Sequence, residues 1–422
     1  MQTNSEQNLT SSAERPCVFF SAGDPSGDAH LAKLIPQLAM RLPNAKFIAY
    51  AGPQTQKTVC DVRFDLTKFA VMMLVRAIAN LPTYLKLLRD ASKLFKEERP
   101  DLVVLVDFPG FNWKIAQRAK KAGIPVLYFM PPQIWGWGQW RVKKMRKYVD
   151  YVLTCFEFED KWLQERGCKT AFIGHPFFES ARAADLDDHF QKTLLAQTQG
   201  QRILAVLPGS RRQELDRNLD DLLDAAQDVV ENTTDVTVVI ATYSQEHSEI
   251  VQARLQARGL NFRVYAGKAR EIMKNAVANL GVSGSVSIEA LSLCKPTVIL
   301  YKISKLEYRV LRFLKRVKYV TLANIIAVDL MPEQSPFYPR KYLPKQTAHT
   351  DQERELMLFP EYLSYRSHAQ DAARILIEWL NNEEKRQELV QRIDQVRSRA
   401  DLFPSPMQRA AEEIVSFMQK KQ

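Results

Sequence analysis

The chain has 422 residues, more than one hydrophobic core usually supports, so two domains are expected. Hydrophobic residues make up 46% and charged residues 25%, an ordinary globular balance with enough apolar material for two cores. The formal net charge of +11 favours an anionic partner, either nucleic acid or a membrane rich in anionic lipid, without deciding between them.

The cysteines and the N-terminus indicate where the protein works. The five cysteines are scattered without a CxxC pair, which argues for reduced thiols in the cytoplasm and against a disulfide framework or structural zinc. Residues 1–15 are polar, are expected to be disordered, and lack the basic-then-apolar layout of a signal peptide. No apolar run is long enough to span a bilayer, so any membrane contact is expected to be peripheral.

The first half of the chain alternates short apolar strands with amphipathic helices. Residues 102–107 read LVVLVD, the near-continuous aliphatic run expected of a parallel strand buried on both faces. Further strands are expected at 17–22, 47–52, 126–130 and 151–155, with helices from Ala29 and over 114–122.

The same alternation restarts after a polar, acidic passage that predicts a linker over 181–200. Strands are expected at 203–207, 236–241, 262–266, 278–282 and 296–301, with helices over 219–231 and 246–258. Two rounds of alternation predict an α/β fold class: two doubly wound Rossmann-like domains, at 16–180 and 201–400, facing a central cleft. Residues 332–360 are predicted as an insertion and 401–422 as a C-terminal helix.

The first motif, Ser21 to Asp28, lies between a strand and a helix. Its glycines let the backbone approach a ligand, and Asp24, Ser26 and Asp28 are candidates to bind sugar hydroxyls. A turn that merely caps the helix is the alternative interpretation.

The second motif, DFPGFN, ends the aliphatic strand. Ligands of open α/β sheets bind at the carboxyl ends of strands, so Asp107 is placed to deprotonate an attacking hydroxyl. The alternative is that Asp107 holds the following turn by hydrogen bonds.

A third motif, PQIWGW, precedes a basic run from Arg141 to Lys147. These side chains suit a membrane interface, a lipid phosphate or nucleic acid, although a solvated basic helix gives the same pattern. A nucleic-acid partner is disfavoured because the aromatic residues cluster in one loop and no nucleic-acid-binding module is recognisable.

Two motifs in the second half suit a nucleotide diphosphate. LPGSRR offers a Gly-Ser turn with Ser210 and the guanidinium of Arg211, and SGSVSIEA opens a helix with Glu289 one turn in. A surface turn and a serine-capped helix are the alternatives. The acidic run 185–188 resembles a metal-binding DxD, but a solvated linker explains it better, and no metal or cofactor is expected.

Taken in order, the motifs resemble the lipid-A-disaccharide synthase family of inverting GT-B glycosyltransferases. The matching pieces are SAGDPSGD with His30, AGP, DFPGFN, AGIPVLYF, PQIWGW with the basic run, Phe158-Glu159, IGHP, LPGSRRQEL, SGSVSIEAL and YVTLAN. Together they cover residues 18–328.

The resemblance implies a UDP-2,3-diacylglucosamine donor and a 2,3-diacylglucosamine 1-phosphate acceptor, with Asp107 and Arg211 as catalytic residues. The N-terminal domain would face the acceptor and the membrane, and the C-terminal domain would bind the UDP-sugar. Partners are therefore the two substrates and the anionic inner face of the cytoplasmic membrane; a homodimer is left open. Substrate-binding residues are expected at Asp24, Ser26, Asp28, Asn112, Gln133, Trp135, His175, Ser210, Ser283, Gly284, Ser285, Glu289 and Asn324.

Several positions depart from the family pattern. Asp24 replaces a glutamate, and the V-M-G-x-x-E motif has Met73 and Arg76 in place of glycine and glutamate. The late V-P-E-F-L-Q pattern best matches 359–364, where Ser364 replaces glutamine. These changes leave two alternatives: a related GT-B enzyme with a different lipid or sugar acceptor, or an inactive homologue that binds anionic lipid.

Overall fold

The computed structural model describes residues 15–68, 81–136, 138–183, 186–284, 286–314, 317–329, 337 and 357–420. Two compact units emerge from these residues. Unit 1 comprises Met1–Ile134, Trp140–Ile173 and Ser405–Gln422, and unit 2 comprises Trp135–Gln139 and Gly174–Pro404. Met73 and Arg76 of the V-M-G-x-x-E motif and most of the insertion predicted at 332–360 lie outside the described residues.

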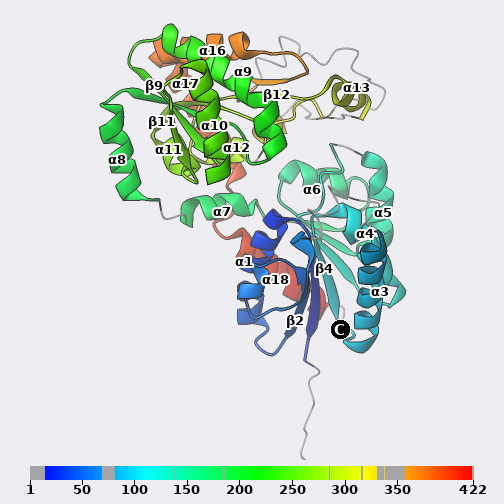
Figure 1. Ribbon diagram of the computed structural model, residues 1–422. Coiled ribbons are helices and arrows are strands. Elements are labelled where there is room, and N and C mark those ends of the chain that lie inside the picture. Colours follow the sequence, from blue (N-terminus) through cyan, green and yellow to red (C-terminus); the bar gives the residue numbers. More distant parts are fainter. Residues whose placement is uncertain are drawn as a thin grey trace, which may run out of the picture. The chain divides into compact units, whose positions relative to one another are not determined.

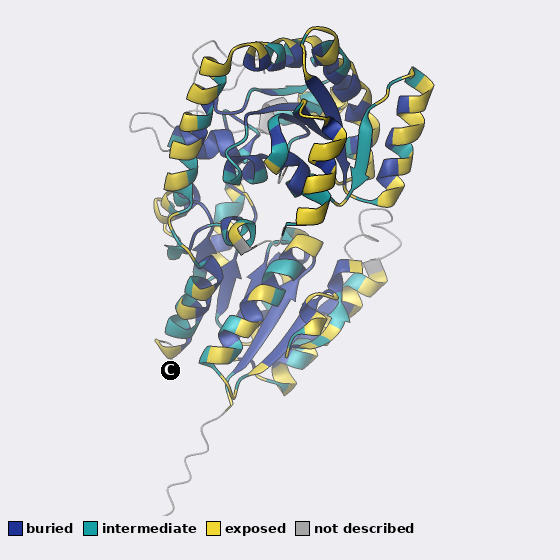
Figure 2. Cartoon of the chain, turned by 90° about the vertical axis from the view of Figure 1, so that its left-hand side faces the viewer, coloured by how far each residue is buried: buried dark blue, intermediate teal, exposed yellow. Residues whose placement is uncertain are grey.

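Unit 1 is built on a seven-stranded parallel sheet with the order β3-β2-β1-β4-β5-β6-β7. The strands are β1 (Cys17–Ala22), β2 (Lys46–Ala51), β3 (Asp61–Asp65), β4 (Leu102–Val106), β5 (Val126–Phe129), β6 (Tyr151–Thr154) and β7 (Thr170–Phe172). Every residue of β1 and β4 is buried, as the apolar runs predict, because helices cover both faces of the sheet (Figure 2).

The helices of unit 1 change face where the strand order reverses after β3. They are α1 (Pro25–Arg41), η1 (Thr55–Lys57), α3 (Leu81–Glu97), α4 (Pro109–Lys121), η2 (Gln139–Arg141), α5 (Val142–Tyr148), α6 (Glu157–Gln164) and α18 (Pro406–Gln419). Helices α1 and α18 cover one face, and α3, α4 and α5 lie side by side on the other (Figure 1).

The last helix of the chain, α18, belongs to unit 1 although the whole of 174–404 precedes it. Glu412 forms an ion pair with Arg41 of α1 at 2.8 Å, and the Phe417 ring stacks on Tyr151 with centroids 5.3 Å apart. The Tyr151 hydroxyl also donates a hydrogen bond to Glu413 at 2.8 Å. The helix predicted at 401–422 is therefore an integral part of the first unit.

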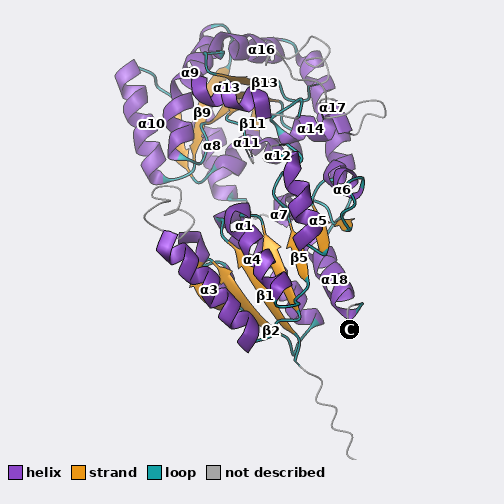
Figure 3. Cartoon of the chain, turned by 90° about the vertical axis from the view of Figure 1, so that its right-hand side faces the viewer, coloured by secondary structure: helices purple, strands orange, loops and turns teal. Residues whose placement is uncertain are grey.

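Unit 2 has a six-stranded parallel sheet with the order β10-β9-β8-β11-β12-β13. Its strands are β8 (Arg202–Leu207), β9 (Val236–Thr242), β10 (Arg263–Ala266), β11 (Ala276–Gly281), β12 (Thr297–Lys302) and β13 (Glu361–Ser364). The reversal of order after β10 again makes the sheet doubly wound, so the predicted α/β fold class is confirmed for both units (Figure 3).

Helices line both faces of this second sheet. They are α7 (Pro176–Ala183), α8 (Asp188–Thr198), α9 (Arg212–Glu231), α10 (Gln245–Arg258), α11 (Ala269–Asn275), α12 (Val286–Ser292), α13 (Lys305–Leu314), α14 (Leu322–Asp329), α16 (Ala369–Asn381) and α17 (Glu383–Ala400). Among the helices of the described residues, none combines the length and apolar character needed to cross a bilayer.

The stretch 181–200, predicted as a linker, contains helix α8, which packs against α11. The Asp187 carboxylate caps this helix by accepting a hydrogen bond from the Phe190 N–H at 2.9 Å, and it pairs with Lys268 at 2.6 Å. Leu194 is fully buried. The polar composition of 181–200 therefore predicted a linker, whereas the structure has a capped helix there with one fully buried apolar side chain.

Candidate active site

The turn after β4 is strained. Asp107 and Phe108 have φ angles of 40° and 45°, so two consecutive side-chain-bearing residues adopt the left-handed conformation. That conformation costs about 1–2 kcal/mol per residue for L-amino acids. Helix α4 then begins at Pro109. Such a turn persists only where its surroundings enforce it.

Two buried side chains enforce this turn through the Asp107 carbonyl oxygen. That oxygen accepts hydrogen bonds from Asn112 Nδ2 at 2.8 Å and from the Tyr128 hydroxyl at 2.6 Å. Asn112 Nδ2 is also 3.1 Å from the carbonyl oxygens of Ser21 and Val106, and its Oδ1 accepts from Ser21 Oγ at 2.6 Å. Asn112, predicted to bind substrate, is fully buried, and these hydrogen bonds tie the ends of β1 and β4 together.

Gly23 links the first two motifs. A Cβ at this position would lie 2.1 Å from Cδ1 of Phe108, so the Phe108 ring occupies the space that a side chain would need. The glycine of the first motif is therefore required by close packing against the second.

The Asp107 carboxyl lies in an environment suited to proton transfer. Its pKa is raised to about 6, first by burial and then by the negative charge of Asp24, while a hydrogen bond from the Phe108 backbone opposes the shift. A general base works best with a pKa near the working pH. Asp24 and Asp107, predicted from separate motifs, are thus electrostatically coupled in unit 1.

Asp28 has a different task from the predicted sugar contact. It is buried, and its carboxylate accepts hydrogen bonds from the N–H groups of Gly52, Gln54 and Thr55 at 2.8, 2.9 and 3.1 Å. These bonds hold the turn after β2. Ser26, in contrast, is exposed near the start of α1.

The residues predicted between β5 and α7 differ in accessibility. Gln133 is exposed, whereas the Trp135 ring is 1% exposed and packs edge-on against Phe337 with centroids 6.2 Å apart. Trp135 is therefore a core residue here. Trp137 lies outside the described residues. His175 Nδ1 accepts a hydrogen bond from the Phe177 N–H at 3.1 Å, at the start of α7.

The LPGSRR turn follows β8 and leads into α9. Gly209 has a φ of 100°, which favours glycine, and Ser210 is exposed. The Arg211 side chain is 79% exposed, and its guanidinium pairs with Glu214 at 3.1 Å, while Glu214 also accepts from the Arg211 N–H at 3.3 Å. A free guanidinium edge beside the N-terminus of a twenty-residue helix suits an anion.

The SGSVSIEA segment connects β11 and α12. Ser283 is half-buried and Gly284 is exposed, while Ser285 lies outside the described residues. Burial raises the pKa of the Glu289 carboxyl. The positive charge of Arg270, 3.9 Å away, opposes this rise. Glu289 therefore faces a cation from α11.

Asn324, the last predicted contact, is fully buried and holds β13 at the edge of the second sheet. Its Oδ1 accepts from the Leu358 and Phe359 N–H groups at 2.9 and 2.8 Å, and its Nδ2 donates to Glu361 at 3.0 Å. The predicted substrate contact is thus satisfied within the protein. Glu361 also accepts from the N–H groups of Val320 and Thr321, which joins the YVTLAN and FPEYLS motifs.

Tyr128 and Glu361 lie in two of the matching motifs, AGIPVLYF and 359–364, but the sequence analysis gave neither side chain a role. Both are fully or almost fully buried polar side chains, at 0% and 4% exposure. The available signal was a hydroxyl or carboxylate within an otherwise apolar segment, because buried polar groups need hydrogen-bond partners. Within the described residues, no group of three or more His, Cys, Asp or Glu side chains is arranged to hold a metal ion.

Two doubly wound parallel sheets in one chain define a GT-B-type α/β protein, and solved structures agree. An S. aureus MnaA–UDP structure superposes with a TM-score of 0.62 at 12% identity, covering 96% of this chain and 97% of that one. The calicheamicin glycosyltransferase CalG4 gives 0.55 at 14% identity, covering 96% and 99%. At these identities the likeness shows the fold alone.

Sequence comparison narrows this class to one family. The model of the lipid-A-disaccharide synthetase family matches residues 18–337. The lipid-A-disaccharide synthase of Haemophilus ducreyi is 31% identical over 360 residues, 82% of this chain and 91% of that protein. The Myxococcus xanthus enzyme is 30% identical over 312 residues, 74% and 81% of the two chains. The chain belongs to the lipid-A-disaccharide synthase family.

Membership confirms the predicted resemblance and the enzyme class. The protein is a glycosyltransferase of lipid A biosynthesis that uses a UDP-sugar donor and a lipid-linked sugar acceptor.

Proposed function

We propose that the enzyme transfers 2,3-diacylglucosamine from UDP-2,3-diacylglucosamine to 2,3-diacylglucosamine 1-phosphate, with Asp107 as the general base. An acceptor hydroxyl oxygen attacks the anomeric carbon, and the bond between that carbon and the UDP oxygen breaks. The hydroxyl proton passes to Asp107, and UDP leaves with the bonding electron pair. The products are a β-1,6-linked disaccharide 1-phosphate and UDP.

The observation that carries this proposal is the strained turn at Asp107. A buried carboxyl with a pKa of about 6 is largely ionised near neutral pH and still basic enough to accept a proton. The hydrogen bonds to its own carbonyl oxygen hold its backbone in place, so little reorganisation is needed during the reaction.

Arg211 is assigned to the departing diphosphate. Negative charge builds on UDP as the glycosidic bond breaks, and a guanidinium with donors on one plane stabilises that charge. The Arg211 side chain is exposed, although its partner Glu214 is only 13% exposed, so the guanidinium can reach a diphosphate from the solvent side.

A basic layer of helices supports docking at the inner face of the cytoplasmic membrane. Helices α3, α4 and α5 with the turn η2 carry thirteen Lys and Arg side chains against two Asp and Glu. The difference equals the net charge of the whole chain, +11. The excess charge is thus concentrated on one face of unit 1, where it can attract anionic lipid.

The reaction is tested with purified enzyme and the two proposed substrates, following UDP release and disaccharide formation by mass spectrometry. Asp107→Asn should lower kcat by about 10³-fold because the base is lost. The matched control, Asp90→Asn on the exposed side of α3, should retain full activity.

Two outcomes of this assay would count against the proposal. Full activity of Asp107→Asn would remove the assigned base. UDP release by the unmodified enzyme only with a different acylated acceptor would favour the related glycosyltransferase, as the departures at Met73, Arg76 and Ser364 suggest.

Membrane docking is tested by co-sedimentation with vesicles containing phosphatidylglycerol, compared with phosphatidylcholine alone. Binding should require the anionic lipid and weaken as salt rises. Lys143→Glu with Lys144→Glu in α5 should reduce binding more than Lys192→Glu with Lys274→Glu, the same charge change in unit 2. Equal loss in both double variants would contradict docking through this face.

A further inference from the structure

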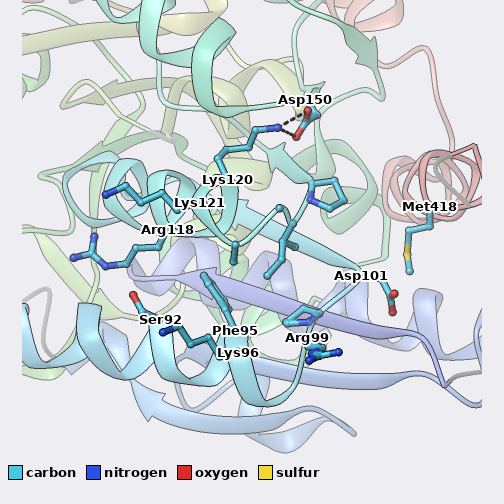
Figure 4. A pocket seen from close by; sticks show the side chains of 15 residues that line it. Ser92, Phe95, Lys96, Arg99, Asp101, Arg118, Lys120, Lys121, Asp150 and Met418 are labelled. Atoms are coloured by element: carbon cyan, nitrogen blue, oxygen red, sulfur yellow. Dashed lines mark hydrogen bonds and ion pairs between the residues drawn. The ribbon is translucent and has the colours of Figure 1, made fainter.

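A pocket of about 870 Å³ lies in unit 1 at the end of the sheet opposite to Asp107 (Figure 4). It opens between the C-terminal ends of α3 and α4, where the chain enters β4 and β5. Asp101, which lines it, precedes β4, whereas Asp107 follows that strand. Asp101 and Asp107 are six residue steps apart along this strand, roughly 20 Å, so the pocket is distinct from the proposed catalytic carboxylate.

Cations dominate the lining of this pocket. They are Lys96, Arg99, Arg118, Lys120 and Lys121. The two acidic lining residues have other partners: Asp150 pairs with Lys120 at 2.8 Å and accepts from the Val126 N–H, and Asp101 accepts from the Cys17 N–H at 2.7 Å.

Four positive charges in the pocket therefore lack a paired carboxylate. Arg118 donates to the carbonyl oxygens of Leu88 and Lys114 at 2.8 and 3.2 Å, which anchors its guanidinium without neutralising it. Within the described part of the chain, Lys96, Arg99 and Lys121 form no ion pair with a carboxylate. In Figure 4, Arg118 and Lys121 extend toward the same side as Lys96. Such like charges repel one another, and an anion would relieve that repulsion.

The inner surface of the pocket is apolar. Phe95, Ile124 and Met418 contribute to it, and each is less than 10% exposed. A cationic rim over an apolar base suits a ligand with a compact anionic group attached to an apolar body. Phosphate fits the rim, because guanidinium and ammonium groups bind its oxygens by charge-assisted hydrogen bonds.

We propose that this pocket binds a phosphate group, either that of an anionic phospholipid headgroup or a free phosphate ion. The site is separate from the catalytic residues, and it does not depend on the reaction proposed above. The pocket lies between α3 and α4 and is therefore part of the basic layer. It would bind a single phosphate group, whereas the rest of the layer would attract an anionic membrane surface without binding one particular group.

The affinity of the intact protein for inorganic phosphate is measured by isothermal titration calorimetry at a fixed ionic strength near 150 mM. Lys96→Ala with Lys121→Ala removes two of the cations that extend to the same side of the pocket and should weaken binding by about tenfold or more, because each one can form a charge-assisted hydrogen bond with a phosphate oxygen. The control, Lys143→Ala with Lys144→Ala, removes the same charge from α5 outside the pocket and should change affinity less than about twofold.

A second titration uses short-chain phosphatidic acid and phosphatidylcholine below their micelle concentrations, which separates the two sources of phosphate. Tighter binding of phosphatidic acid than of inorganic phosphate, lost in the pocket variant, would assign a lipid headgroup. Equal affinities for both, lost in the same variant, would assign a free phosphate ion. Equal weakening in both double variants, or no binding of either anion at millimolar concentration, would overturn the proposal.

Two further readouts keep the result interpretable. Circular dichroism checks that both double variants remain folded. The glycosyltransfer assay shows whether the catalytic site is intact, so failure of the pocket proposal is distinguishable from failure of the proposed function.

Discussion

The turns that carry Asp107 and Arg211 follow inner strands of two similar sheets, β4 and β8, yet they are built differently. The Asp107 turn is strained and is held by Asn112 and Tyr128, both fully buried. The Arg211 turn relies on a glycine at position 209, and the Arg211 side chain is 79% exposed and forms one ion pair, with Glu214.

The two halves of a transfer reaction place different demands on such turns. A base that must meet one hydroxyl benefits from a backbone fixed before substrate arrives. A side chain that must accept and later release a nucleotide benefits from weak contacts that are easily exchanged.

After the loss expected for Asp107→Asn, the largest effect is expected at the exposed turn. Arg211→Ala should lower kcat by about 10²–10³-fold, because a transition-state charge loses its cationic partner. The neighbouring Arg212→Ala removes an arginine paired with Asp216 at 2.9 Å and should leave kcat within about twofold. Steady-state kinetics at varied UDP-sugar concentration would measure kcat for both variants. Equal losses of kcat in the two variants would contradict a specific role for Arg211.

The next prediction concerns stability and pH. Because the folded-state pKa of Asp107 is raised to about 6, ionising this carboxyl costs the folded protein stability as pH rises from about 4 to 6, and the loss is complete above that. Asp107→Asn should therefore increase the free energy of unfolding by about 1–3 kcal/mol at pH 7.5 and by little at pH 4. Urea titrations at both pH values test this, and a gain independent of pH would argue against the buried charge as its cause.

A smaller effect is expected when a hydrogen bond that fixes the Asp107 backbone is removed. Tyr128→Phe removes one hydrogen bond to the Asp107 carbonyl oxygen and should lower kcat about tenfold, with the KM for the donor unchanged. Tyr151→Phe, on the next strand, removes the hydroxyl that donates to Glu413 and serves as the control. If both variants lose stability but neither loses kcat, Tyr128 has only a structural role.

The smallest effect concerns the neighbouring carboxylate. The profile of kcat/KM against pH should fall on the acid side with an apparent pKa of about 6, because protonated Asp107 cannot act as a base. Asp24→Asn removes a negative charge that raises this pKa, so the acid limb should move to lower pH by less than about one unit. Asp90→Asn should leave the limb in place, and an unmoved limb in Asp24→Asn would refute the coupling.

Much of the fold could be predicted because a buried parallel strand is a short, continuous apolar run that can be recognised without knowing its partners. The apolar run 17–22 coincides with β1, and 102–107 exceeds β4 by one residue. In contrast, α8 and β13 carry too little apolar signal of their own. Helix α8 is held by the buried side chain of Leu194. Strand β13 is held by Asn324, which lies in helix α14.

The candidate site could be predicted as a set of motifs. Which of its side chains form hydrogen bonds within the protein could not be predicted. Asp28 bonds to N–H groups 24 to 27 positions away, and Asn112 bonds to Ser21 across 91 positions. No local pattern reveals such partners. A motif read along the chain therefore mixes side chains proposed to meet substrate, such as Asp107, with side chains that hold the turns in place.

The return of α18 to unit 1 has a consequence for synthesis on the ribosome. Residues 174–404 emerge before α18 does, so the sheet that carries Asp107 has one flank uncovered while the second unit is already being completed. Exposed apolar surface of that kind promotes aggregation during synthesis. A premature stop codon just before Pro406 would thus damage the part of the enzyme that was made first.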